Sequence, residues 1–195
     1  NAKTLNTSAA GWFGKMKIGI EYTLMQSGPM SMAPSQLGAF AKSDPSQPSA
    51  NLQYHVQPLS LEKFGDPLHP FSAFTASVCN LNPLSRGHVR IRSPRHEDAP
   101  AIMANYLSVD GDRRVAADSL RLTRRIVGMP ALAAYSPREI KPGVQYQNDD
   151  ELARLAGISR RLGIGADRHA PRCIRPFHQG GELAGELRLE HGDLA

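Results

Sequence analysis

The sequence has few of the residues that mark disulfide-rich, zinc-binding or membrane-spanning proteins. Among its 195 residues there are two cysteines, Cys79 and Cys173, and neither belongs to a Cys-x-x-Cys pair. A disulfide framework or a metal site is therefore not expected, and a reducing, cytoplasmic location is favoured. No apolar run approaches the roughly 20 residues that a membrane span requires, so we expect no such span.

Positive charge is present but is not concentrated in one stretch. The formal net charge is +5, and the basic residues are spread through the chain. Net charge of this sign permits binding to nucleic acid, but a dispersed pattern is more typical of a solvated surface. With 41% hydrophobic residues, the chain is long enough to bury the core of one compact domain.

Hydrophobic periodicity predicts three helices. The first lies within residues 14–28, where Met16, Ile20 and Leu24 recur at helical spacing, and a third starts near Asn148. The second, over about 112–127, is the clearest, with acidic residues at its start, an apolar stripe and a stop at Gly128. Arginines occupy much of its remaining surface: Arg113, Arg114, Arg121, Arg124 and Arg125.

Four segments are predicted as strands: residues 33–41, 51–58, 74–81 and 88–93. The last two are expected to pair as a hairpin through the turn at 82–87, where Gly87 would take a positive φ. Val89 and Ile91 would then be buried, and Arg90 and Arg92 exposed. The predicted fold class is α+β, an antiparallel sheet flanked by helices, with the arginine-bearing helix packed on one face.

The same region carries a long series of spaced motifs. They are Pro83-x-Ser85-Arg86-Gly87-x-Val89-x-Ile91-x-Ser93, then Pro100-x-Ile102 and Asn105-Tyr106-Leu107, followed by an Asp and the arginine-bearing helix. This segment closely resembles part of the C-terminal substrate domain of the glucose-methanol-choline (GMC) oxidoreductases, which include choline dehydrogenase and related alcohol dehydrogenases. The resemblance implies that Ser85-Arg86-Gly87 is a structural turn.

The resemblance implies a flavoenzyme that uses FAD to oxidise the CH-OH group of a small alcohol, in the manner of choline or alcohol dehydrogenases. A base removes the hydroxyl proton while hydride passes to the flavin. The substrate would be a small alcohol and no nucleic acid would be bound.

Two parts of the family's machinery have no counterpart in this sequence. The chain opens on Asn1 without the glycine-rich FAD-binding unit, and "SRRLGIGADRHAP" stands where the family has its catalytic His-Pro-x-Gly-Thr motif. His69 and His178 lie at the wrong places to replace that histidine, and His55 has no acidic neighbour by local spacing. No catalytic, cofactor-binding or metal-binding residue is therefore assigned, and we expect a fragment that is inactive alone.

The resemblance ends near residue 159. Residues 1–159 are interpreted as a partial GMC substrate domain, and residues 160–195 as a non-matching, disordered tail. That tail has many Arg and Gly residues and no sustained hydrophobic period. Without the FAD domain the body should expose apolar surface and tend to aggregate.

In the family, one sheet face looks toward the flavin ring. By strand alternation, Gln36, Gln57 and Asn80 are expected to present amide groups on that face, where an amide can orient a substrate hydroxyl. The alternative is that each belongs to an ordinary polar, partly solvated sheet face.

A second function class stays open at this stage. The chain would then be a non-catalytic basic module that binds nucleic acid or another anionic partner through the Arg113–Arg125 helix.

Overall fold

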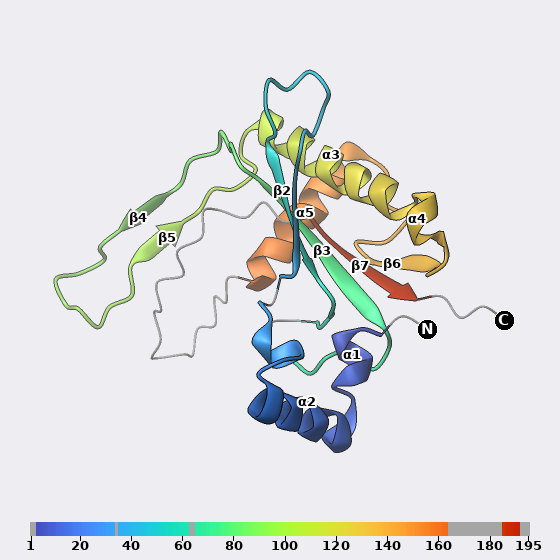
Figure 1. The fold of residues 1–195 in the computed structure, drawn as a ribbon. Helices are drawn as coiled ribbons and strands as arrows, with labels where there is room; N and C mark the ends of the chain where they lie inside the picture. Colours follow the sequence, from blue (N-terminus) through green and yellow to red (C-terminus); the bar gives the residue numbers. More distant parts are fainter. Residues whose placement is uncertain (1–2, 34, 63–64, 164–184, 192–195) are drawn as a thin grey trace.

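The computed structural model describes residues 3–33, 35–62, 65–163 and 185–191, and it contains both helices and strands. Its helices are α1 (Leu5–Ser8), α2 (Gly11–Met25), the short 3-10 helix η1 (Pro29–Ser31), α3 (Asp110–Val127), α4 (Pro130–Ala133) and α5 (Asp149–Gly163). Its strands are β1 (Leu37–Ala41), β2 (Leu52–Gln57), β3 (Ala73–Asn80), β4 (His88–Arg90), β5 (Ala101–Met103), β6 (Pro137–Lys141) and β7 (Gly185–His191) (Figure 1).

Five of these strands form one antiparallel sheet in the order β1-β2-β3-β7-β6. The α+β class and the adjacent antiparallel strands β1, β2 and β3 are confirmed, as are the three predicted helices. These elements follow from short-range patterns. For example, Leu52 and Tyr54 of β2 are buried, while Gln53 and His55, which alternate with them, are only partly buried.

Helices α3 and α5 pack together over one face of the sheet (Figure 1). α3 begins with Asp110 and Asp112 and has Arg124 and Arg125 in its last turn, an order that suits the helix dipole. One apolar side of α3 packs on α5 in a cluster of Ala116, Ala117, Leu120, Leu152 and Ala156. Another side, with Val115 and Leu122, packs on Leu52, Tyr54 and Val78 of the sheet.

The predicted hairpin is wrong in its partner strand. β4 pairs with β5, with Val89 opposite Ile102, and not with β3. Together they form a separate two-stranded arm that extends away from the sheet (Figure 1). Arg90 and Arg92 are exposed as predicted, but Val89 is 67% and Ile91 87% exposed. The predicted burial of Val89 and Ile91 is therefore wrong, because neither side of the arm packs on the body of the described chain.

The role expected for Gly87 is also different. Gly87 is not among the residues with a positive φ. A Cβ at Gly87 would instead lie 2.2 Å from the carbonyl oxygen of Met103 and 2.4 Å from that of Ala104. Glycine is required here because the two segments that form the arm approach each other closely at the base of the arm.

The segment after residue 159 contributes two described pieces of structure. α5 continues to Gly163, and β7 lies between β3 and β6. The structure therefore differs from the expected disorder over Gly185–His191, a segment whose sequence alternates Leu187 and Leu189 with charged residues and which pairs with two distant strands. The other residues of the segment lie outside the described ranges, and the division of the chain at residue 159 stays a proposal.

Candidate functional site on the sheet face opposite the helices

The sheet face opposite α3 is lined by polar side chains of β2 and β3. Leu52 and Tyr54 pack toward α3, so the alternating residues of β2 point to the other face. The register places these residues opposite their β3 partners as Gln53 with Cys79, His55 with Ser77, and Gln57 with Thr75. We call this set the polar face.

His55 is the titratable group at the centre of the polar face. It is partly buried, and its direct partner Ser77 places a hydroxyl-bearing side chain with its Cβ roughly 5 Å away. An imidazole accepts or donates hydrogen bonds. Local spacing could not reveal this neighbour, because Ser77 is 22 positions away and is brought close only by strand pairing.

The three amides predicted as substrate contacts do not come together. Gln57 is on the polar face at one end of β2, where its Nε2 lies 3.4 Å from the Ser35 Oγ. Gln36 precedes β1 near that end and lines a hollow of about 340 Å³ between α1, η1 and Pro58.

Asn80 lies at the other end of β3, opposite Leu52, and so points to the helix-covered face. It is 4% exposed, and its Oδ1 accepts the N–H of Asn82 at 3.0 Å. In this structure Asn80 supports a turn. A role in binding substrate stays a prediction for Gln36 and Gln57, which share one end of the sheet.

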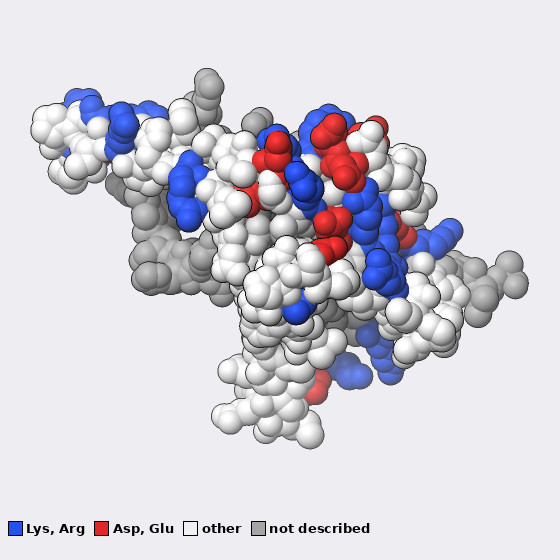
Figure 2. All heavy atoms as spheres, turned by 90° about the horizontal axis from the view of Figure 1, so that it is seen from above, with Lys and Arg blue, Asp and Glu red and all other residues white. Residues whose placement is uncertain are grey.

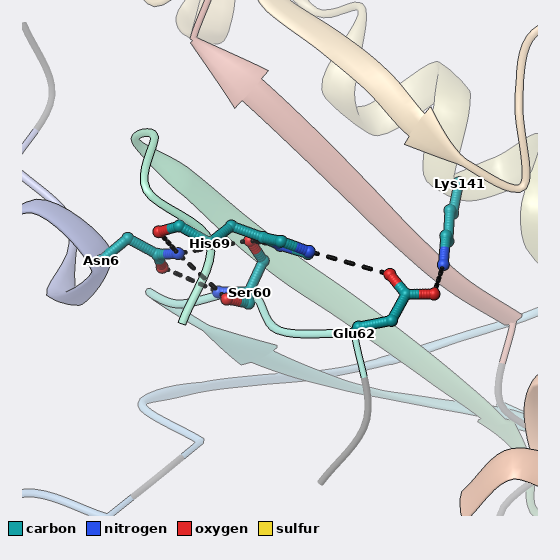
Figure 3. Close-up of polar contacts among 5 residues, drawn as sticks. All are labelled: Asn6, Ser60, Glu62, His69 and Lys141. Carbon is teal, nitrogen blue, oxygen red and sulfur yellow. Dashed lines mark hydrogen bonds and ion pairs between the residues drawn. The ribbon is translucent and has the colours of Figure 1, made fainter. Parts of the chain in front are cut away.

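A polar network closes the Gln57 end of the polar face (Figure 3). Asn6 of α1 donates to the carbonyl oxygens of Ser60 and His69 at 2.9 and 2.8 Å and accepts the Ser60 N–H at 2.8 Å. Glu62 lies 3.8 Å from His69 Nε2 and forms an ion pair with Lys141 of β6. Thr75 adds a hydrogen bond to the Leu59 carbonyl at 2.9 Å. The loop after β2 is thereby held across the end of the sheet.

Ser60, His69 and Glu62 have the composition of a nucleophile, a base and an acid. Ser60 Oγ lies 2.9 Å from His69 Nδ1, but Ser60 is completely buried. A nucleophilic serine must reach its substrate, so this arrangement is structural and joins α1 to the loop.

The Ser85-Arg86-Gly87 motif forms the corner between the arm and α3. Asp112, 1% exposed, accepts the N–H groups of Leu84 and Ser85 at 2.8 and 2.7 Å. The Ser85 Oγ in turn accepts the N–H groups of Ser108 and Val109 at 3.0 and 3.3 Å. These bonds connect the two ends of the arm to the first turn of α3. The structural role that the resemblance implies for this motif agrees with its contacts.

The electrostatics of Asp112 fit this role. Burial opposes ionisation of its carboxyl group and by itself would raise the pKa. The pKa of Asp112 is nevertheless held below its ordinary value by hydrogen bonds from the Ser85 hydroxyl and from the Leu84 and Ser85 N–H groups, and by the charge of Arg86. The carboxylate is therefore an ionised structural tether.

Three of the five α3 arginines are engaged within the chain. Arg124 makes a two-pronged ion pair with Glu139 of β6, 2.9 Å for each contact, and donates to the Tyr146 and Gly143 carbonyls. Arg121 pairs with Asp118 and Asp149, and Arg113 with Asp110. Figure 2 shows acidic and basic groups intermixed over this part of the surface. The helix does not present an uninterrupted cationic row.

The described residues do not fit the main binding site of FAD. All their strand pairings are antiparallel, whereas a dinucleotide is commonly held by a parallel βαβ unit. Within the described ranges no group of three or more potential ligands could hold a metal ion. No helix in that part of the chain is long and apolar enough to cross a membrane.

Known proteins share the corner motif and α3, and the similarity extends over most of the chain. Residues 83–161 match the family model of the GMC oxidoreductases. This segment belongs to the GMC oxidoreductase family. An oxygen-dependent choline dehydrogenase from Pectobacterium carotovorum subsp. carotovorum (strain PC1) is 35% identical over 144 residues, which is 74% of this chain and 26% of that protein.

Two further relatives carry the same name. The oxygen-dependent choline dehydrogenases of Yersinia pestis (strain Pestoides F) and Yersinia pseudotuberculosis serotype O:1b (strain IP 31758) are each 36% identical over 141 residues, covering 72% of this chain and 25% of each relative. The chain thus spans about a quarter of the length of these GMC oxidoreductases.

Proposed function

We propose that this chain is the substrate-domain part of an FAD-dependent oxidoreductase that acts on the CH-OH group of a small alcohol such as choline. The observation that carries the proposal is the GMC segment at residues 83–161 together with a sheet whose face opposite α3 is polar around His55 and Ser77. A cytoplasmic location is proposed with it from the low cysteine content.

In this proposal the polar face forms the wall of the pocket that faces the flavin. Bound FAD supplies the hydride acceptor. His55 and Ser77 would hydrogen-bond the substrate hydroxyl, and Gln57 would orient it from the end of β2.

Exposed apolar surface supports contact with a neighbouring domain. α2 buries none of its residues, and Trp12, Phe13 and Leu24 are 69%, 75% and 77% exposed. Apolar surface of this extent is typical of an interface. We therefore propose that the chain alone binds no FAD tightly, oxidises no alcohol and tends to aggregate.

A chimera tests the proposed function. Residues 36–157 would replace the matching segment of the Pectobacterium choline dehydrogenase, which keeps its own remaining sequence. We expect a flavin-loaded protein that reduces a dye in the presence of choline or a related alcohol. His55→Ala in the chimera should raise KM for the alcohol roughly tenfold, because it removes one hydrogen bond to the substrate hydroxyl while the catalytic motif of the host enzyme is kept. A flavin-loaded chimera that oxidises none of a panel of alcohols, or that is unaffected by His55→Ala, would contradict the assignment.

The nucleic-acid alternative is tested with the isolated chain. Because Arg113, Arg121 and Arg124 are held in ion pairs, we expect no binding that follows the steep salt dependence of phosphate contacts. Tight binding that falls with salt and is lost in Arg114→Ala/Arg125→Ala would favour the basic-module function instead.

A further inference from the structure

Gly38 of β1 lies directly beside His55. The register pairs these two residues, so Gly38 is on the same side of the sheet as the polar face. Phe40, two residues further on, pairs with Gln53 and shares that side. Paired residues of neighbouring antiparallel strands have Cα atoms roughly 4.5–5.5 Å apart. His55 therefore has the side chain of its partner Ser77 on one flank and no side chain of its β1 partner on the other.

The backbone does not require a glycine at position 38. Gly38 is not among the residues with a positive φ, and β1 pairs regularly with β2 through all five of its residues. Among the described residues, a Cβ at Gly38 would come within 4 Å of the Tyr54 carbonyl oxygen alone, at 3.6 Å, which is an ordinary contact. At Gly87, by contrast, a Cβ would lie 2.2 Å from a carbonyl oxygen. Larger residues are therefore compatible with the fold at position 38.

A glycine inside a strand weakens that strand, because it loses much conformational freedom on folding and has no side chain to pack. Such a glycine often marks a place where a ligand approaches the sheet closely. The space above Gly38 adjoins the imidazole of His55, which the proposed function assigns to the substrate hydroxyl. When the hydroxyl is bonded to His55, the carbon atoms next to it have room over Gly38.

Larger side chains bound this space along β1. Phe40 and Gln36 lie two positions to either side of Gly38. A rise of about 3.4 Å per residue places their Cα atoms roughly 14 Å apart, and by alternation both side chains share the face of Gly38. The Phe40 side chain is apolar and the Gln36 side chain ends in a neutral amide. An apolar wall with a few polar groups is typical of a site that binds a small organic molecule.

We propose that Gly38 determines substrate specificity by leaving room beside His55 for alcohols with a broad carbon body. Broad alcohols are those that are branched or cyclic next to the CH₂OH group, or that carry a trimethylammonium group. Narrow, unbranched alcohols do not need this room. The inference rests on the proposed function and adds to it the residue that limits the width of the substrate. Gly38 acts only through the space that it leaves and takes no part in proton or hydride transfer.

Substitution of Gly38 in the choline dehydrogenase chimera tests the proposal. The panel of alcohols runs from ethanol and 1-butanol to cyclohexylmethanol and choline, and kcat/KM is measured for the narrowest and the broadest alcohol that the chimera oxidises. Gly38→Val should lower the broad-to-narrow ratio of kcat/KM about tenfold or more, the discrimination that one or two carbon groups give in a pocket. Gly38→Ala should lower it less. Because both alcohols are measured on the same preparation, a loss of folded or flavin-loaded protein does not change the ratio.

Ala39→Val is the matched control. It adds carbon atoms to the next residue of β1, which pairs with Tyr54 and lies on the other side of the strand, so the ratio should not change. An active chimera whose ratio is the same in Gly38→Val as in Ala39→Val, or which oxidises the narrow alcohols alone, would overturn the inference and leave the proposed function in place. A flavin-loaded chimera that oxidises no alcohol of the panel would overturn both.

Discussion

Replacement of Asp112 by asparagine should loosen the connection between the arm and α3. The Asp112 carboxylate is 1% exposed and accepts two backbone N–H groups, from Leu84 and Ser85, at 2.8 and 2.7 Å. Asparagine keeps the shape of the side chain but turns one acceptor into an NH₂ donor, so one of these N–H groups loses its partner. Hydrogen bonds to charged groups contribute about 1.5–3 kcal/mol each. We expect Asp112→Asn to lower the free energy of unfolding by about 3 kcal/mol, including the loss of charge at the remaining bond.

Urea unfolding followed by far-ultraviolet circular dichroism measures this difference. Asp110→Asn is the matched control, because it makes the same change in the same helix turn at a carboxylate whose side chain is 72% exposed. Its ion pair with Arg113 and its position near the helix start are together expected to contribute at most about 1 kcal/mol. If Asp112→Asn is no more destabilising than Asp110→Asn, the carboxylate is not the tether described above.

The pH dependence gives an independent check on Asp112. Its pKa is lowered in the folded state, so its contribution to stability is fully present above the unfolded-state value of about 4. That contribution is lost as the pH falls through the lower, folded-state pKa. The gap in unfolding free energy between wild type and Asp112→Asn should therefore narrow below about pH 4. A gap that is constant down to pH 2 would contradict this electrostatic account.

Two further substitutions test other contacts. Arg124→Ala leaves Glu139, whose side chain is 5% exposed, without its two-pronged partner and should lower the free energy of unfolding in urea by about 3–5 kcal/mol. The control Arg125→Ala should change it by no more than about 0.5 kcal/mol. Equal effects of the two variants would show that the Arg124–Glu139 pair is unimportant. Gly87→Ala puts a Cβ against the Met103 carbonyl oxygen and should lower the free energy of unfolding by about 1–3 kcal/mol. Amide hydrogen exchange in β4 and β5 should be faster than in wild type. Unchanged exchange and stability would mean that the close approach at Gly87 is not required.

Local sequence determined the helices and several strands of this protein. The spacing of apolar residues in α2 and α3, the acidic start of α5 and the alternation in β2 each depend on neighbours within one or two turns or a few strand positions. Such patterns also separate the faces of a strand, which is why His55 and Gln57 were expected on a common polar face and lie there.

Only the tertiary structure decided which strands pair and what each face meets. Alternation in residues 88–93 predicts a strand but contains no information on its partner, and the Asp112 tether directs this strand into the arm with β5 instead of toward β3. Asn80 fell on the helix-covered face because its register with Leu52 depends on a residue 28 positions away. The alternation of Leu187 and Leu189 with charged residues is typical of a strand, but it does not tell that β7 lies between β3 and β6. Strand register is set by long-range contacts, so these features were beyond the reach of local patterns.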